Sequence, residues 1–280
     1  MSRMNPSDVN VVLYHAKCSD GMGAAYAAWK LLGNRAEYIP CAHGNPPPDV
    51  VGKNVAILDF SFPNAVTKQM IEDANSLLII DHHKSAVVEL HDISETIFDM
   101  NNSGATMAWN YFHPDKTVPK FIQYITDRDL WRFELPYSKE FSRAFDMVPF
   151  EFEEFEKFED DSVFDDAVKR GSYILAYTKT VVKTLMEKAS KRKLRGHDVL
   201  VINSQHLMSE LGAAMAMKAD LAVIWFYDHH SNRTKVSLRG QHAIVDASEI
   251  ARSFGGGGHP NASGFIIDGM DIEGIFDVEE

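Results

Sequence analysis

The chain has 280 residues, 45% of them hydrophobic and 24% charged, which is typical of a globular protein long enough for two domains. Its formal net charge is −12, and residues 197–280 contain five Lys or Arg against twelve Asp or Glu. Proteins that grip long nucleic acid usually present a basic face, so this charge argues against that class and favours a small phosphorylated substrate. With no membrane-length apolar run, no apolar leader and only two cysteines, we expect a cytoplasmic protein without a disulfide framework.

The first hundred residues alternate between apolar runs and helical patterns. Strands are expected at 9–14, 38–40, 55–58 and 77–80, and helices at 24–32 and 64–74. Strands that alternate with helices in this way predict an α/β fold, with a parallel sheet covered by helices.

From about residue 103 the pattern turns helical. Helices are expected at 104–112, 119–130 and 138–147, and phenylalanines spaced by three residues predict an amphipathic helix near 152–158. A long helix at 165–190 would connect two domains. The basic stretch 188–195 is interpreted as the end of that helix, where cations are favoured, or alternatively as a basic lip near a phosphate-bearing substrate.

We place the domain boundary beside this basic stretch. Residues 1–190 would form a metal-binding catalytic domain with its connecting helix, and residues 196–280 a smaller substrate-binding domain. The smaller domain is expected to be α/β as well, with strands and helices at 199–202, 210–218, 221–227, 235–239, 246–254 and 262–267.

Acidic residues and histidines follow the predicted strands of the first domain. His15 and Asp20 follow the first strand, Asp59 follows the third, and Asp81-His82-His83 follows the fourth. Ligands bind at the carboxyl ends of the strands in open α/β sheets, so these side chains are expected to meet. Oxygen and imidazole donors suit Mn²⁺, Mg²⁺ or Fe²⁺, and the pattern predicts metal-assisted hydrolysis of a phosphate ester.

Two further motifs lie in the second domain. The run Gly255–Gly258, followed by His259, predicts an anion clamp because glycine lets backbone N–H groups approach an anion closely. A flexible linker is disfavoured by the strand-like continuation 262–267. A second Asp-His-His, at Asp228-His229-His230, is followed by Ser231-Asn232 and predicts an exposed hairpin turn.

These motifs, in this order, resemble the DHH/DHHA1 phosphoesterase family. Asp81-His82-His83 is similar to the motif that names the family, and residues 255–265 are similar to the glycine-rich signature of the DHHA1 domain. Members degrade short RNA, cyclic dinucleotides, single-stranded nucleic acid or 3′-phosphoadenosine 5′-phosphate, and members without the DHHA1 domain hydrolyse pyrophosphate. The resemblance implies an active site in the cleft between a parallel-sheet domain and a smaller α/β domain.

The resemblance also implies roles for individual residues. Metal would be bound by His15, Asp20, Asp59, His82 and Asp127, with Asp129 as the competing choice for the last. The catalytic groups would be Asp81, which orients a histidine, and His83, which faces the scissile phosphate. Substrate would be bound by Arg239, Gly256, Gly257, Gly258, His259 and Asn261.

The first motif departs from the family pattern in one respect. Many members have two aspartates there, whereas this chain has only Asp20, with Cys18 or Ser19 in the region of the missing carboxylate. Cys18 is then either a ligand or a buried bystander, and the number of resident metal ions, one or two, stays open.

For the substrate we expect very short RNA. The leading hypothesis is hydrolysis of 5′-phosphorylated dinucleotides, such as the linear products of cyclic dinucleotides, to mononucleotides by a metal-activated water. Alternatives are a nucleotide 3′-phosphatase, an exopolyphosphatase or a non-catalytic nucleotide-binding sensor. Mn²⁺ is the expected cofactor, with Mg²⁺ or Fe²⁺ as alternatives. No long nucleic acid and no membrane is expected as a partner, and a homodimer is left open.

Overall fold

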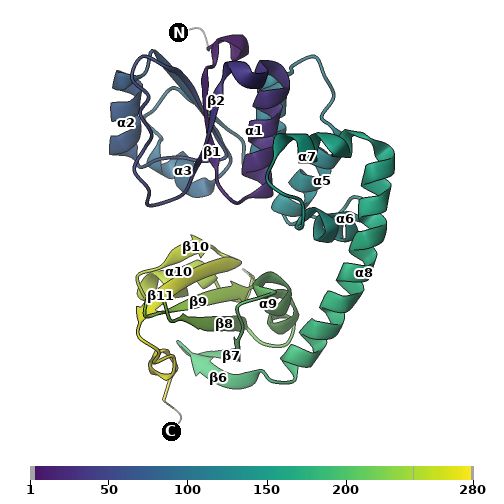
Figure 1. Cartoon of the computed structure of the whole chain (residues 1–280). Helices are drawn as coiled ribbons and strands as arrows, with labels where there is room; N and C mark the ends of the chain where they lie inside the picture. The colour runs from purple at the N-terminus through teal and green to yellow at the C-terminus, as the bar shows by residue number, and fades with distance from the viewer. Residues whose placement is uncertain (1–3, 242, 279–280) are drawn as a thin grey trace. The chain divides into compact units, whose positions relative to one another are not determined.

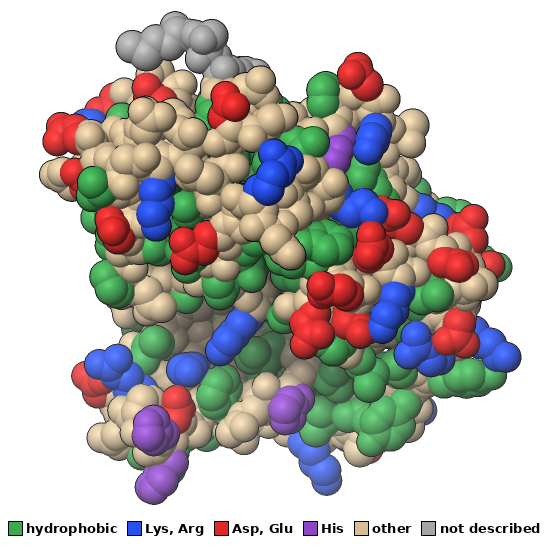
Figure 2. All heavy atoms as spheres, turned by 45° about the horizontal axis from the view of Figure 1, so that its top comes forward, with side chains coloured by type: hydrophobic (Ala, Val, Ile, Leu, Met, Phe, Trp, Pro, Cys, Tyr) green, Lys and Arg blue, Asp and Glu red, His purple; other side chains and the backbone are tan. Residues whose placement is uncertain are grey.

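The computed structural model describes residues 4–241 and 243–278 (Figure 1). The chain divides into two compact units, Met1–Leu175 and Ala176–Glu280, and the division falls within helix α8 (Asp161–Met186). None of the helices in the described residues is both long enough and apolar enough to cross a membrane. On the face drawn in Figure 2, basic side chains lie scattered among acidic ones.

A parallel sheet forms the centre of the first unit and confirms the predicted α/β fold. Its strand order is β2-β1-β3-β4-β5, with every neighbouring pair parallel. The strands are β1 (Val11–His15), β2 (Glu37–Cys41), β3 (Asn54–Leu58), β4 (Ser76–Asp81) and β5 (Thr96–Phe98). Leu13, Ile57 and Ile79 lie in register, so the three central strands end at the same edge.

Helices cover both faces of this sheet (Figure 1). Val12 and Ile80 share one buried cluster with α1 and α4, while Leu13 and Ile79 share another with Met70 of α2. The helices of this unit are α1 (Ser19–Leu32), α2 (Asn64–Asp73), α3 (Lys84–Glu89), α4 (Gly104–Phe112), α5 (Lys120–Asp129), α6 (Ser138–Phe145) and α7 (Phe152–Glu156). Short 3₁₀ helices cover Pro6–Asp8, Gly33–Arg35 and Lys157–Glu159.

The second unit is built on a mixed sheet of order β10-β11-β9-β8-β7-β6, in which only β7 and β8 pair in parallel among the described strands. Helices α9 and α10 pack on opposite faces, since Ile224 belongs to the cluster under α9 and Val223 to the one under α10. Its elements are β6 (Ser190–Leu194), β7 (His197–Asn203), α9 (Met208–Ala216), β8 (Leu221–Asp228), β9 (Arg233–Gly240), α10 (Ala247–Ser253), β10 (Gly257–His259), β11 (Ala262–Asp268) and a 3₁₀ helix at Glu273–Ile275.

Residues 190–194 of the basic stretch form strand β6, so the interpretation of this stretch as a helix end was wrong. Helix α8 ends at Met186, and β6 pairs antiparallel with β7. Arg195 and Gly196, with φ of +51° and +80°, form the turn between them, as the common two-residue hairpin requires. Lysines and arginines on an edge strand discourage pairing with other chains, which explains a basic sequence here.

Candidate metal centre

Asp59 lies at the middle of a cluster formed where β1, β3 and β4 end. His15 is the last residue of β1, Asp59 directly follows β3, and His82 directly follows β4. The Nδ1 atom of His15 is 3.4 Å from Asp59 Oδ2, and His82 Nε2 is 3.2 Å from Asp59 Oδ1. The carboxylate of Asp59 therefore lies between two imidazoles, one on each oxygen.

Two further carboxylates approach His82. Its Nε2 atom is 3.6 Å from Asp20 Oδ2 and 3.5 Å from Asp129 Oδ2. Asp20 is buried, and its two oxygens accept hydrogen bonds of 2.7 and 2.9 Å from the backbone N–H groups of Gly104 and Ala105. These groups open helix α4, where the helix dipole stabilises a negative charge.

Two glycines make room for the cluster. A Cβ at Gly104 would lie 2.5 Å from the Cβ of Asp59, and one at Gly21 would lie 2.3 Å from the carbonyl oxygen of His15. Asp59 itself has a φ of +53°, a left-handed backbone that is sparsely populated and concentrated at functional sites. The Asp20-Gly21 and Ser103-Gly104 pairs are thus needed for packing around the site, a signal that the sequence reasoning did not exploit.

Asp81 holds His83 in place from behind. Its Oδ1 atom is 2.7 Å from His83 Nδ1 and also accepts a hydrogen bond from the backbone N–H of His82. The Ser61 hydroxyl donates to the other oxygen at 2.6 Å. This arrangement fixes the ring of His83 and leaves its Nε2 atom as the ring nitrogen that can reach a substrate.

The charges of the cluster strongly perturb one another. Burial raises the pKa of Asp20 well above its usual range, and the neighbouring Asp59 and Asp129 raise it further. Burial alone would raise the pKa of Asp59 too, but the adjacent His15 and His82 lower it to about 2. Burial opposes protonation of His82, yet the three carboxylates around it raise its pKa to about 9.

The donor set fits a divalent cation. Both side-chain oxygens of Asp59 and the Nδ1 atom of His15 are buried, without a hydrogen-bond partner among the described residues. Such orphaned polar atoms are costly unless something binds them. The candidate donor atoms form three groups, and within each group they lie no more than 4.8 Å apart. The groups are His15–Cys18–Asp59, Asp59–His82–His83 and Asp20–His82–Asp129. Adjacent ligands of an octahedral ion lie about 3 Å apart, close to the separations observed here.

Asp127, predicted as a ligand, points away from this cluster, and the alternative Asp129 takes its place. The oxygens of Asp127 accept the backbone N–H groups of Glu134 and Leu135, at 3.0 and 3.3 Å. Residues two apart on a helix face directions about 200° apart, so α5 cannot present both carboxylates to one site. The structure brings His15, Asp20, Asp59 and His82 together, and their role as metal ligands stays a prediction.

Cys18 lies in one of the three donor groups. It begins helix α1 without a side-chain capping bond, and it is free of disulfides, as is Cys41. Burial, together with the charges of Asp59 and Asp20, raises the pKa of the Cys18 thiol to about 12. A bound cation would reverse that effect, because a thiolate ligand is deprotonated by the metal.

Two of the predicted substrate-binding residues, Arg239 and His259, lie in one row across the sheet of the second unit. His259 pairs with Ala262, and Ala262 pairs with Arg239, so His259 and Arg239 share a face two strands apart. His259 and Asn261 are exposed, whereas Arg239 is partly buried. A Cβ at Gly212 would lie 2.3 Å from the Cγ atom of Arg239, which shows how tightly α9 packs on this arginine.

The glycine run before His259 has two kinds of member. A Cβ at Gly256 would lie 2.1 Å from the carbonyl oxygen of Gly264, and Gly258 has a φ of +137° and faces Ser263 at 2.6 Å. Packing of the β10–β11 hairpin therefore demands glycine at both positions. A Cβ at Gly257 would meet no atom within 4 Å, and the residue has no left-handed backbone, so the fold does not require a glycine there.

Comparison with known proteins agrees with this geometry. Residues 192–278 match the DHHA1 domain. An uncharacterized protein of Acanthamoeba polyphaga mimivirus is 34% identical over 296 residues, covering 96% of this chain and 70% of the viral protein. Oligoribonuclease NrnB of Bacillus subtilis is 25% identical over 228 residues, covering 71% of this chain and 55% of that protein.

Two solved structures share the fold at low sequence identity. A pGpG-specific phosphodiesterase, PggH from Vibrio cholerae, has a TM-score of 0.56 at 12% identity, covering 95% of this chain and 94% of that one. An exopolyphosphatase-related protein from Bacteroides fragilis has a TM-score of 0.55 at 15% identity, covering 95% and 89%. With the Asp-His-His motif at its carboxylate cluster and a DHHA1 domain after it, the chain belongs to the DHH/DHHA1 family of metal-dependent phosphoesterases.

Proposed function

We propose that this protein hydrolyses very short RNA, above all 5′-phosphorylated dinucleotides, to mononucleotides. The observation that carries the proposal is the doubly orphaned carboxylate of Asp59 between His15 and His82, at the edge where the strands of a parallel sheet end. The substrate class draws on two similar proteins, one named an oligoribonuclease and the other a pGpG-specific phosphodiesterase. The acidic net charge of −12 also suits a small substrate better than a long polyanion.

In this proposal His15, Asp20, Asp59, His82 and Asp129 hold one or two divalent ions, with Mn²⁺ as the expected metal. The bound metal would lower the pKa of a coordinated water and polarise the scissile phosphate. Asp81 orients His83, whose Nε2 atom would meet the phosphate as an electrostatic stabiliser or proton donor. Its pKa is raised by the hydrogen bond to Asp81, which favours the protonated form that this role needs.

The second unit would bind the rest of the substrate. Arg239 and His259 share one face of the sheet, and a guanidinium there suits a phosphate or a base. Of the three glycines predicted to bind substrate, Gly256, Gly257 and Gly258, only Gly257 leaves open space where an anion could approach the backbone. Gly257→Val is therefore expected to weaken substrate binding while thermal unfolding is preserved, whereas Gly256→Ala should lower the unfolding temperature. If the two variants changed substrate binding and unfolding temperature alike, Gly257 would have no separate role in anion binding.

A hydrolysis screen of the full chain tests the function. Purified protein is given Mn²⁺ or Mg²⁺ with 5′-phosphorylated dinucleotides, longer RNA, 3′-phosphoadenosine 5′-phosphate, cyclic dinucleotides and polyphosphate. Release of mononucleotides from the dinucleotides, abolished by Asp59→Asn and with longer RNA spared, is the expected result. Turnover of the bisphosphate or polyphosphate alone would replace the substrate, and binding without any turnover would indicate a nucleotide sensor.

A further inference from the structure

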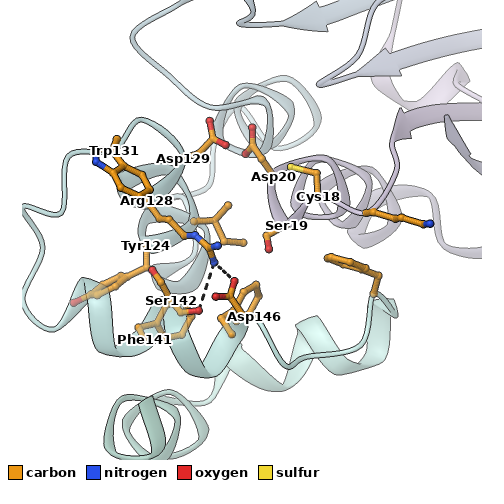
Figure 3. Close-up of a pocket in the computed structure, with 14 residues that line it drawn as sticks. Cys18, Ser19, Asp20, Tyr124, Arg128, Asp129, Trp131, Phe141, Ser142 and Asp146 are labelled. Carbon is orange, nitrogen blue, oxygen red and sulfur yellow. Dashed lines mark hydrogen bonds and ion pairs between the residues drawn. The ribbon is translucent and has the colours of Figure 1, made fainter. Parts of the chain in front are cut away.

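A pocket of about 500 Å³ opens beside the carboxylate cluster, wholly within the first unit (Figure 3). Asp20 and Asp129, which both approach His82, stand together at one side of it. Helix α1 contributes Cys18 and Ser19, and helices α5 and α6 form the opposite wall. Its size lies within the range of about 300–1,000 Å³ usual for small-molecule sites. A ligand in this pocket would therefore lie next to the proposed metal centre.

The pocket is rich in aromatic side chains, two of which remain accessible. Tyr124, Phe141 and Phe145 are buried in its walls, while Trp131 and Phe150 keep 56% and 47% of their surface exposed. Aromatic and other apolar side chains with a few polar groups among them are the usual lining of a small-molecule site. Successive bases of single-stranded nucleic acid are commonly bound by stacking on such rings.

The charges at the base of the pocket are already paired. The Arg128 guanidinium donates to the carboxylate of Asp146 and to the carbonyl oxygen of Ser142. Asp146 also accepts a hydrogen bond of 3.1 Å from Arg143. Because the Arg128 guanidinium already donates to a carboxylate and to a carbonyl oxygen, this part of the pocket offers hydrogen-bonding groups to the polar edge of a ring. Lys17 adds one exposed ammonium group at the pocket.

The loop that carries Trp131 is rigidly held. Trp131 has a φ of +55°, and its backbone N–H donates to the carbonyl oxygen of Arg128 at 2.8 Å. The Asp127 carbonyl accepts the N–H groups of Arg132 and Phe133, and the Asp127 carboxylate accepts the next two along the chain. The indole also packs against the ring of Phe133, with centroids 4.9 Å apart. A left-handed tryptophan fixed by this many bonds is typical of a residue presented for binding.

We propose that this pocket receives one nucleoside of the substrate, with its base stacked on the exposed aromatic rings. The inference rests on the proposed function and adds a specificity site to it. With a nucleoside seated here, the adjoining phosphate would lie next to the metal site that Asp20 and Asp129 are proposed to form. Arg128 and Asp146 line this pocket together with the aromatic rings, and its volume of about 500 Å³ has room for a nucleoside.

The first test measures binding without catalysis. Adenosine and guanosine, which carry no phosphate, are titrated into the full chain while indole fluorescence is recorded. Saturable quenching that is lost in Trp131→Phe, although three other tryptophans remain, is the expected result. Equal quenching in Trp131→Phe, or displacement of the nucleoside by inorganic phosphate, would overturn the proposal.

The second test uses hydrolysis of a 5′-phosphorylated dinucleotide. Trp131→Ala is expected to raise KM about tenfold, the effect of losing one base–aromatic stack, with kcat nearly unchanged. Phe150→Ala should act in the same direction, and Tyr173→Ala, which removes an equally exposed ring from α8, should have no effect. Unchanged KM in both pocket variants would refute the pocket but leave the proposed function intact. Nucleoside binding that depends on Trp131, in a protein that cleaves no dinucleotide, would support the pocket but refute the proposed function.

Discussion

The two Asp-His-His triplets of this chain are alike in sequence and different in structure. In each, the aspartate ends an apolar strand, β4 for Asp81 and β8 for Asp228, and two histidines follow. The first triplet lies against the carboxylates of Asp20, Asp59 and Asp129. The second forms the turn of the β8–β9 hairpin, with His229 and His230 exposed and the Asp228 carboxylate accepting the N–H of His230, as predicted.

The difference comes from how each strand is connected to the next. In the parallel sheet the chain must cross over after every strand, so several strand ends with their polar residues gather at one edge. In the antiparallel hairpin the chain turns back at once, and its tip faces solvent. A motif therefore becomes a site only when the topology brings complementary side chains to it.

The largest expected effect comes from removing one histidine of each triplet. His82→Ala should lower kcat/KM by about 10²–10³-fold or more, the loss typical of removing one preorganised group that acts on transition-state charge. His229→Ala should leave it unchanged. Steady-state hydrolysis of the dinucleotide measures both, with circular dichroism as the control for folding. Comparable losses in the two variants would show that the second triplet also serves the reaction.

The next comparison separates the two aspartates of α5. Loss of a group that only hydrogen-bonds a metal ligand typically weakens metal binding about 10–100-fold. Because Asp129 is proposed as a ligand itself, Asp129→Asn should weaken Mn²⁺ binding by at least this factor. Asp127→Asn should leave Mn²⁺ affinity nearly unchanged but lower the free energy of unfolding by about 1–2 kcal/mol, because its loop loses a charged acceptor. Calorimetric Mn²⁺ titration and thermal unfolding distinguish them, and a larger metal defect in Asp127→Asn would restore the family-based assignment.

A smaller effect is expected from the aspartate that begins each triplet. Asp81→Asn should reduce activity about 10–100-fold, since it alters the partner that orients His83 without removing a proposed ligand. Asp228→Asn should retain full activity. Kinetics of both variants at saturating Mn²⁺ provide the measurement. Full activity of Asp81→Asn would mean that His83 needs no such support.

The last comparison concerns the dependence of metal binding on pH, with a change of about tenfold for each pH unit. In metal-free protein the pKa of His82 is about 9, since its carboxylate neighbours outweigh the effect of burial. Its proton stabilises the fold below the usual histidine pKa, and this contribution is lost as the pH rises through about 9. Mn²⁺ must displace that proton, so its affinity should rise about tenfold per pH unit from 7 to 9. Titrations at three pH values check this, and His229→Ala should behave as wild type. A flat profile would contradict the assignment of His82 as a ligand.

Sequence patterns located most elements but missed the short ones. Strands β1, β3 and β4 and helices α1, α2 and α4 were predicted because their apolar spacing is strong and extends over several residues. The three-residue strands β5 and β10 and the six-residue helix α3 are too short for such a signal. The strand at 190–194 was missed because its alternation consists of charges, with Leu194 as its one fully buried residue.

Of the site, the sequence by itself determined which residue types follow each strand, and hence a cluster of carboxylates and imidazoles at one edge of a parallel sheet. Only the tertiary structure decided that Asp129 and not Asp127 faces His82, and that one Asp-His-His lies in a site and the other at a hairpin tip. It also placed a rigid aromatic pocket beside Asp20. The physical reason is that direction around a helix and proximity between distant loops depend on packing, which no local pattern encodes.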